Sequence, residues 1–337
     1  MEGVMKLSTS AARRVQFSQD ALRRWVAAQG TNQAELQEMA RLERQRHYGN
    51  RLFLRAVVEI SNHCDCSCLY CGMRRQNGAL DRYRLTHEEI MEAIGKALDL
   101  GIRTIMLQSG EDPSFEADAV CRICSETRKM GAQNVILCLG MRPLEQYQAF
   151  LAAGANKYIL KHETANPVLF AKAKPGITLF ARLHHLLNLR RLGFAIGTGC
   201  ICGLPGQTDE DLADDVLLMR RIRPDMSSVS PFVPSDDSPY GKHPQGDLER
   251  TINLMAIMRL ALGAALIPSV SALDTLSPGF QLRGLNSGAN VMTLNMTPRN
   301  KRNNYLIYKE GRRIVDLDHV QRLAEQAHLE PASFPES

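Results

Sequence analysis

The sequence has very little of several features that would place it in a specialised class. It contains a single tryptophan, and its aromatic fraction is 6%. No apolar stretch reaches the roughly 20 residues that a helix needs to cross a bilayer, because Arg259 interrupts the best candidate, residues 254–268. The N-terminus also lacks the apolar core of a signal peptide. These absences predict a cytoplasmic protein that does not bind membranes.

An excess of one charge is missing as well. Lys and Arg total 41 and Asp and Glu total 36, for a formal net charge of +5. The basic residues are scattered among acidic ones, so the sequence does not predict nucleic-acid binding. Hydrophobic residues make up 44% of the 337 residues, which is enough for a sizeable core, and this length suits one β/α barrel with a terminal addition.

The two ends of the chain differ from its middle. Residues 1–50 are polar and helix-prone, with Leu36, Met39 and Leu42 at helical spacing, so they are predicted to form a helical extension. Residues 321–337 are predicted to form a C-terminal helix and a loose tail, since Pro331 and Pro335 interrupt the last residues. The main domain should therefore span residues 51–320.

Within that domain, apolar β-rich runs alternate with amphipathic helical patterns. The strand candidates lie at residues 51–61 and near residues 103, 134, 157, 195, 225, 265 and 289. Alternating strands and helices indicate parallel βαβ units. The predicted fold is α/β, a (β/α)8 TIM-type barrel that is complete or nearly complete. An open doubly wound sheet is the alternative.

Three cysteines follow directly on the first strand candidate, in the segment SNHCDCSCLYCGMRR. Cys64, Cys68 and Cys71 have the spacing C-x3-C-x2-C. Three thiolates on one loop can each ligate one iron of a 4Fe-4S cluster and leave the fourth iron open to a small molecule. A structural zinc site with Cys66 as fourth ligand is the alternative, although zinc sites usually take their ligands as two separated pairs.

This motif, with the aromatic Tyr70 before its last cysteine, resembles the radical S-adenosylmethionine (SAM) superfamily. The resemblance implies one 4Fe-4S cluster, SAM bound to its open iron, and one-electron cleavage of SAM to methionine and a 5'-deoxyadenosyl radical. Five segments together resemble the HydE-type FeFe-hydrogenase maturases, in the group that also holds biotin synthase and methylornithine synthase. They are CLYCGMRRQNGALDRYRLTHEEI, LQSGEDP, HETANPVLF, GLPGQT and SGANV.

The resemblance also implies contacts with SAM. Gly110 and Glu111, after the second strand candidate, would take the amino group, and Glu163, after the fourth, would be a second polar anchor. Arg182 would pair with the methionyl carboxylate, which suits a guanidinium fork. Each charged residue could instead form an ordinary surface or loop ion pair.

Other candidates lie further along the chain. Gly203 and Pro205, in GLPGQT, would let the backbone approach the adenine ring, although this segment could also be an ordinary turn and helix N-cap. Lys161, at a strand mouth, could hold an anionic substrate or be solvated. The predicted substrate side comprises two serines on the predicted seventh strand and two tyrosines: Ser269, Ser271, Tyr305 and Tyr308.

The sequence departs from its relatives at two points. No cysteine follows Cys202, so the second cluster that some relatives carry near the C-terminus is absent. Met141 stands where relatives would have an acidic residue, which bears on the substrate pocket.

The remaining cysteines are predicted to be buried apolar residues unless the fold brings them together as cluster ligands: Cys121, Cys124, Cys138, Cys200 and Cys202.

The predicted function is that of a HydE-type radical SAM enzyme. Its substrate would be a small organometallic molecule, a cysteine-bound organoiron precursor of the FeFe-hydrogenase active site. Expected partners are an electron donor such as ferredoxin or flavodoxin and other hydrogenase maturases. Alternatives are an amino-acid mutase like methylornithine synthase, a sulfur-insertion enzyme like biotin synthase, and a zinc-bearing interaction module.

Overall fold

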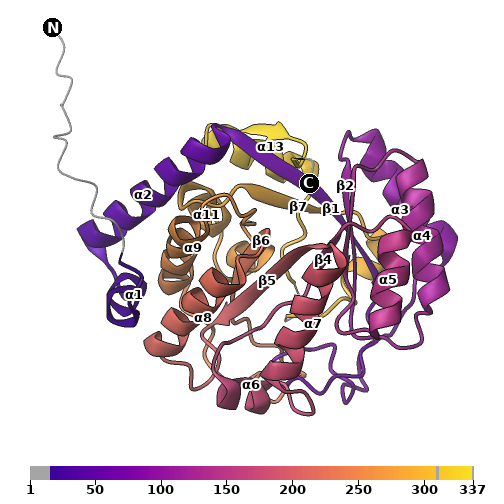
Figure 1. The fold of residues 1–337 in the computed structure, drawn as a ribbon, viewed down its shortest axis with the longest axis horizontal. Helices are drawn as coiled ribbons and strands as arrows, with labels where there is room; N and C mark the ends of the chain where they lie inside the picture. The colour runs from indigo at the N-terminus through magenta and orange to yellow at the C-terminus, as the bar shows by residue number, and fades with distance from the viewer. Residues whose placement is uncertain (1–15, 309–310, 336–337) are drawn as a thin grey trace, which may run out of the picture.

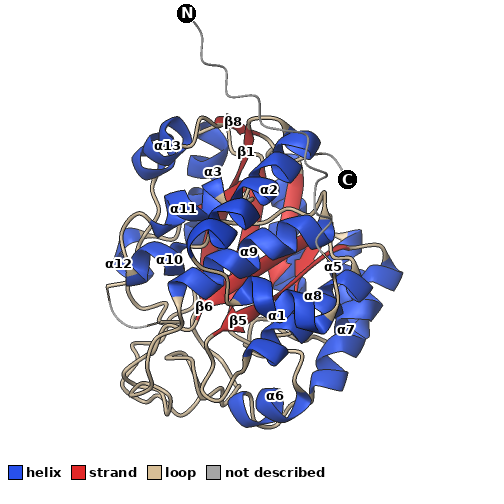
Figure 2. Cartoon of the chain, turned by 90° about the vertical axis from the view of Figure 1, so that its left-hand side faces the viewer, coloured by secondary structure: helices blue, strands red, loops and turns tan. Residues whose placement is uncertain are grey.

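The computed structural model describes residues 16–308 and 311–335. The first 15 residues of the predicted extension and the last two of the predicted tail therefore lie outside the described residues. Strands form the centre of the molecule and helices surround them (Figures 1 and 2). Seven strands are all parallel: β1 (Arg51–Ser61), β2 (Thr104–Ser109), β3 (Asn134–Cys138), β4 (Lys157–Ile159), β5 (Ala195–Cys202), β6 (Met226–Pro231) and β7 (Val291–Asn295).

The strands follow one another in the order β6-β5-β4-β3-β2-β1-β7. The gap between β6 and β7 is filled by residues 265–268, where Leu266 bridges to Met226 and Pro268 bridges to Val291. The ring is therefore nearly complete, which confirms the barrel prediction and excludes the open sheet.

The predicted seventh strand is wrong in detail, because only these isolated bridges form. Pro268 has no N–H with which to extend a ladder, and the helix α10 (Ser271–Leu276) begins three residues later. Ser269 and Ser271 thus lie beyond the bridged segment and at a helix start.

The helices begin and end where the sequence provides caps. Thr86 and Glu89 form a capping box at the start of α3 (His87–Asp99), and Gly49 ends α2 (Gly30–Tyr48). Helices α1 (Gln19–Val26) and α2 pack outside the barrel against α8 (Asp209–Ile222) and α9 (Leu248–Leu262). The remaining helices are α4 (Ala117–Lys129), α5 (Leu144–Ala152), α6 (Pro167–Ala173), α7 (Leu179–Leu192), α11 (Phe280–Asn286), α12 (Arg299–Arg302) and α13 (Leu317–Gln326).

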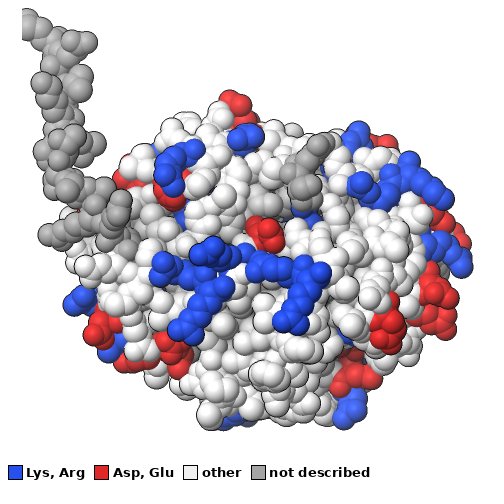
Figure 3. Space-filling view, in the orientation of Figure 1, with Lys and Arg blue, Asp and Glu red and all other residues white. Residues whose placement is uncertain are grey.

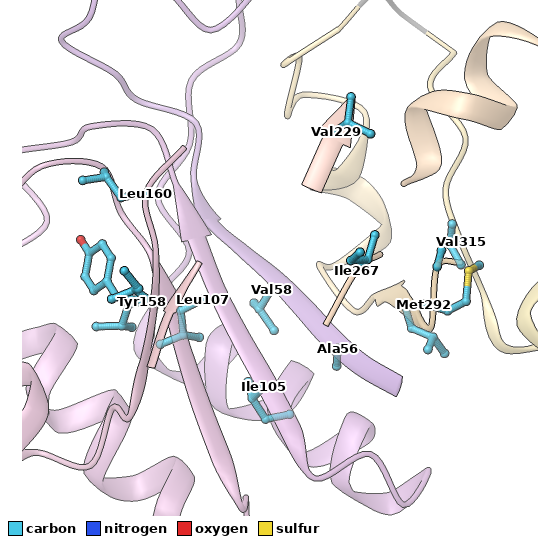
Figure 4. Close-up of a cluster of buried hydrophobic side chains, with 14 of the residues drawn as sticks. Ala56, Val58, Ile105, Leu107, Tyr158, Leu160, Val229, Ile267, Met292 and Val315 are labelled. Atoms are coloured by element: carbon cyan, nitrogen blue, oxygen red, sulfur yellow. The ribbon is translucent and has the colours of Figure 1, made fainter. Parts of the chain in front are cut away.

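Side chains alternate between the two faces of each strand. On β1, Ala56 and Val58 belong to the core between strands and helices, as do Ile105 and Leu107 on β2 (Figure 4). The intervening residues face the barrel interior, where polar side chains line a cavity. These include Arg55, Glu59, Gln108, Ser228, Thr293 and Asn295. Large polar residues inside a barrel favour ligand binding over simple packing.

The C-terminal segment corrects the prediction of a loose tail. Residues Glu330–Ala332 form a short strand, β8, that pairs in parallel with the start of β1. Phe334 is 3% exposed and packs edge-on against Phe53, with ring centroids 5.9 Å apart. Phe334 thereby packs the segment against the hydrophobic cluster at the end of the barrel where the strands begin.

Charge is less evenly spread on the surface than along the sequence. Figure 3 shows Lys and Arg in a band across the middle of one face. Arg190, Arg220, Arg221 and Arg223 line a surface pocket where α7 and α8 end, positions at which the helix dipole favours cations. Among the described residues, no helix is both long enough and apolar enough to cross a membrane.

Candidate active site

A cavity lies at the C-terminal ends of the strands, where β/α barrels place their active sites. Its wall combines residues from the loop after β1, the loops after β2 to β4, and α7. Most of the predicted site residues meet here: Cys64, Cys68, Tyr70, Cys71, Gly110, Glu111, Lys161, Glu163, Arg182, Tyr305 and Tyr308.

Arg82 holds the cysteine loop in shape. Its guanidinium donates hydrogen bonds to four backbone carbonyls, those of Asn62 (2.6 Å), Met73 (2.9 Å), Arg74 (2.8 Å) and Asn77 (3.2 Å). These carbonyls flank the cysteines on both sides along the chain. One rigid, planar donor group therefore closes the loop on itself, a role that lysine could not fill.

Gly110 brings the loop after β2 against the cysteine loop. A Cβ at this position would lie 2.2 Å from the carbonyl oxygen of His63 and 2.6 Å from Cys64 Cβ. The backbone N–H of Asp65 also donates to the Glu111 carbonyl at 2.9 Å. The two loops can approach this closely only because residue 110 is glycine.

The four neighbouring cysteines divide into two groups. Cys64, Cys68 and Cys71 line the cavity, whereas Cys66 is 8% exposed and does not. Three thiols around one cavity fit the donor set of a 4Fe-4S cluster with one open iron. The cavity lining agrees with the C-x3-C-x2-C spacing, and the assignment of these three cysteines as the cluster ligands stays a prediction.

The other five cysteines do not come together. Cys138 faces the barrel interior, Cys200 and Cys202 face the helices from β5, and Cys121 and Cys124 lie on α4. Among the described residues, no three His, Cys, Asp or Glu side chains converge so as to hold a single metal ion. The ligands that a sulfur-donating second cluster would need are thus dispersed over the fold.

Glu111 and Arg182 form the charged centre of the cavity. Arg182 Nη1 donates to Glu111 Oε1 at 2.9 Å, and Lys174 Nζ lies 3.3 Å from the same oxygen. Burial alone would raise the pKa of Glu111, but Lys174 and Arg182 outweigh it and lower the pKa to about 2. Glu111 is therefore a carboxylate, able to accept the amino group of a ligand.

Gly140 and Lys174 are site residues that the sequence did not reveal. Gly140 has φ +73°, and a Cβ there would lie 2.0 Å from Glu111 Cγ, so this glycine makes room for the carboxylate. The sequence signal that could have indicated Gly140 is its position two residues after the end of β3. No sequence signal indicated Lys174, because its sequence neighbours belong to an ordinary helix end.

Glu163 is held in an unusual backbone conformation. Its φ is +63°, in the left-handed region that non-glycine residues seldom adopt. Its N–H donates to the Gly199 carbonyl at 3.0 Å, and its own carbonyl accepts from Ile201 at 2.8 Å. The neighbouring His162 is fully buried, 3.3 Å from Asp215. Strained residues that are fixed in this way cluster at functional sites.

Three of the four predicted substrate residues line a deeper part of the barrel interior. A second cavity shares Gln108, Lys161 and Tyr308 with the first and is also lined by Ser269 and Ser271. Tyr305 lines only the outer cavity. The two cavities adjoin through these shared residues, so a ligand in the second, inner cavity would lie next to the first, outer cavity.

Three positions that the sequence analysis singled out, Gly203, Pro205 and Met141, do not line either cavity. Gly203, with φ +95°, packs against Gly246, and the Gln207 side chain accepts from the N–H groups of Gly203 and Leu204. Pro205 lies in the same turn, whose neighbours Ile201 and Phe232 line the cavity instead. Met141 is half-buried and packs against the main core. The adenine contact predicted for Gly203 and Pro205 remains a prediction.

Comparison with known proteins adds to this geometry. Residues 58–219 match the model of the radical SAM superfamily. The chain is 41% identical over 297 residues to the [FeFe] hydrogenase maturase subunit HydE of Thermotoga maritima, covering 88% of this chain and 85% of that protein. It is 27% identical to the 3-methylornithine synthase of Methanosarcina acetivorans, covering 94% and 91%.

Solved structures show the same fold. A crystal structure of methylornithine synthase superposes with a TM-score of 0.82 at 24% identity and 94% coverage of both chains. The FeFe-hydrogenase maturase HydG from Carboxydothermus hydrogenoformans superposes with a TM-score of 0.79 at 21% identity, over 94% of this chain and 76% of that one. The likeness at 41% identity extends over nearly the whole chain, so the protein is a radical SAM enzyme that belongs to the HydE family.

Proposed function

We propose that this protein is a HydE-type maturase that cleaves SAM reductively and acts on a small organometallic substrate during assembly of the FeFe-hydrogenase active site. The observation that carries the proposal is the convergence of three cysteines, Glu111, Glu163 and Arg182 on one cavity. The 41% identity to the Thermotoga maritima maturase supports the choice of substrate.

Each group has a role in this proposal. One 4Fe-4S cluster, on Cys64, Cys68 and Cys71, supplies the electron that cleaves SAM when both are bound. Glu111 and Glu163 would hold the amino side of SAM, and Arg182 would pair with the methionyl carboxylate. Tyr70 packs beside the cluster ligands in the cavity wall.

The inner cavity would take the substrate. Arg55 and Lys161 offer positive charge, and Ser269, Ser271 and Tyr308 offer hydroxyl groups. Such a lining suits a small anionic, polar molecule. The partners would be a one-electron donor such as ferredoxin or flavodoxin and the other hydrogenase maturases.

Two experiments test the proposal in sequence. The first is anaerobic reconstitution with iron and sulfide, followed by spin-resonance spectra of the reduced protein with and without SAM. We expect a 4Fe-4S signal that changes on adding SAM, together with 5'-deoxyadenosine. Stoichiometric zinc, or no cluster, would contradict the assignment of the cysteines.

The second experiment asks whether maturation of an FeFe-hydrogenase apoprotein by the other maturases depends on this chain. We expect hydrogenase activity with the wild-type chain and none with Cys68→Ala. SAM cleavage without maturation would refute the proposed substrate and leave the enzyme class intact. Acceleration of SAM cleavage by a free diamino acid would favour a mutase instead.

A further inference from the structure

A buried lysine lies beside the cysteine loop, outside every motif that predicted the site. We propose that Lys174 is a positioning residue that favours reduction of the cluster, by holding a positive charge and N–H donors against Cys68. The inference rests on the proposed assignment of Cys64, Cys68 and Cys71 as cluster ligands.

The ammonium group lies at the junction of two loops. Lys174 Nζ is 3.4 Å from Cys68 Sγ and 3.5 Å from Cys66 Sγ, both in the loop after β1. It is also 3.3 Å from Glu111 Oε1, in the loop after β2, and its side chain is 6% exposed. A buried ammonium keeps its charge only when its partners are close and polar. Lys174 is thus one cation shared between a proposed cluster ligand and the proposed SAM anchor.

The backbone fixes the lysine in this place. Lys174 caps the C-terminus of α6, with its N–H donating to the Phe170 carbonyl at 2.8 Å. The preceding carbonyl, that of Ala173, accepts from Leu69 in the cysteine loop at 2.8 Å. The helix end is therefore bound to the loop that carries the cysteines. A change in the length or charge of the side chain acts directly on that loop.

Charge balance gives the lysine its effect. In the wall of the cavity, Lys161, Lys174 and Arg182 face Glu111 and Glu163, so loss of Lys174 would remove the excess of positive charge that these side chains provide. Reduction adds a further negative charge to a cluster already bound by three thiolates. Hydrogen bonds to the sulfurs and nearby charge set the potentials of such clusters. A cation at this distance stabilises the reduced state more than the oxidised state.

The step itself is a transfer of one electron. It passes from a low-potential one-electron carrier, or from dithionite in vitro, to the oxidised cluster. No bond is made or broken at Lys174, and no proton moves, because the side chain stays an ammonium throughout. The predicted effect is therefore on the cluster's midpoint potential, measured before any SAM is added.

The experiment compares three reconstituted holoproteins with the wild type. Lys174→Met removes the charge at similar length, Lys174→Arg keeps it, and Lys172→Met removes an exposed lysine of the same helix as a control. Iron and sulfide content are measured first, and a spin-resonance redox titration follows. At a fixed solution potential, the ratio of reduced to oxidised cluster should fall about tenfold in Lys174→Met, which is about 59 mV for a one-electron couple.

We expect Lys174→Arg and Lys172→Met to stay within about twofold of the wild-type ratio. A fully loaded Lys174→Met with the wild-type midpoint potential would overturn the inference. If that variant takes up less iron, Lys174→Gln, which keeps an N–H donor without charge, is compared with Lys174→Arg, and equal potentials would again overturn it. Absence of a cluster from every chain, wild type included, would instead refute the proposed function.

Discussion

Arg182 reaches across the cavity to Glu111 while the other side of its guanidinium is anchored. Nη1 donates to Glu111 Oε1 at 2.9 Å, and Nε donates to the Lys161 carbonyl at 2.8 Å. The backbone contact fixes the guanidinium plane and leaves the carboxylate contact exchangeable. A ligand that brings both an amino group and a carboxylate could replace that contact by two new ion pairs, which is what SAM offers.

Replacement of Arg182 should therefore weaken SAM binding. Losing one charged hydrogen bond to the carboxylate would cost about 2 kcal/mol, or about a 30-fold rise in Kd. The substitution Arg182→Lys should cost less than Arg182→Ala, since lysine keeps the charge but not the fork. Spectroscopic titration of both reconstituted variants with SAM measures the effect. The exposed Arg191→Ala on the same helix is the control, and an unchanged Kd in Arg182→Ala would remove Arg182 from the site.

The cysteine loop provides a matched pair of variants. Cys68→Ala should abolish both the cluster and SAM cleavage, because two thiolates cannot hold the cubane. Cys66→Ala should keep both, because Cys66 lies outside the cavity lining. Iron content and 5'-deoxyadenosine after anaerobic reconstitution report the two outcomes. Equal losses in the two variants would show that the ligand assignment is wrong.

Asp112 should make the stability of the cluster-free protein depend on pH. Its side chain is 1% exposed and accepts from Arg84 at 2.8 and 2.9 Å and from Ser61 at 2.7 Å. Burial would raise the pKa of Asp112, but these hydrogen bonds outweigh it and hold the pKa below its ordinary value. A lowered carboxyl pKa stabilises the fold above the unfolded-state pKa, near 4, and this contribution is lost as the pH falls through the folded-state value.

Asp112→Asn should accordingly lower the free energy of unfolding by about 1–3 kcal/mol at pH 7. The difference from wild type should shrink below about pH 4. Denaturant unfolding at pH 7, 4 and 3 measures it, with the exposed Asp237→Asn as control. A difference that is constant across this range would mean that the charge of Asp112 does not stabilise the fold.

The sequence predicted those features that depend on local pattern. The spacing of Cys64, Cys68 and Cys71 lies within one loop. The strand positions followed from apolar runs long enough to be distinctive. Glu111 and Arg182 were found through the resemblance to a family, since nothing in their local sequence indicates that they form an ion pair.

The features that were missed depend on contacts between distant segments. Lys174 becomes a site residue only because Leu69, far from it along the chain, binds the end of its helix. Residues 265–268 form bridges without a strand, which an apolar run cannot distinguish from a strand. The segment around Phe334 looked loose because a three-residue strand and one aromatic ring leave almost no pattern in the sequence.

Glu163 allows backbone strain and ligand contact to be separated. With φ +63°, a residue that has a Cβ is strained by about 1 kcal/mol or more, whereas glycine is not. Glu163→Gly and Glu163→Ala both remove the carboxylate, but only glycine relieves the strain. Both variants should therefore bind SAM at least about tenfold more weakly, a loss of about 1.4 kcal/mol.

Although both variants should lose SAM affinity, they should differ in stability. Glu163→Gly should be more stable than Glu163→Ala by about 1 kcal/mol, as measured by denaturant unfolding of the cluster-free chains. Equal stability of the two variants would mean that the hydrogen bonds to Gly199 and Ile201 hold residue 163 at no cost in strain. Wild-type SAM affinity in Glu163→Gly would mean that the carboxylate makes no contact with SAM, and that the left-handed backbone at this position serves only to turn the chain from β4 toward α6.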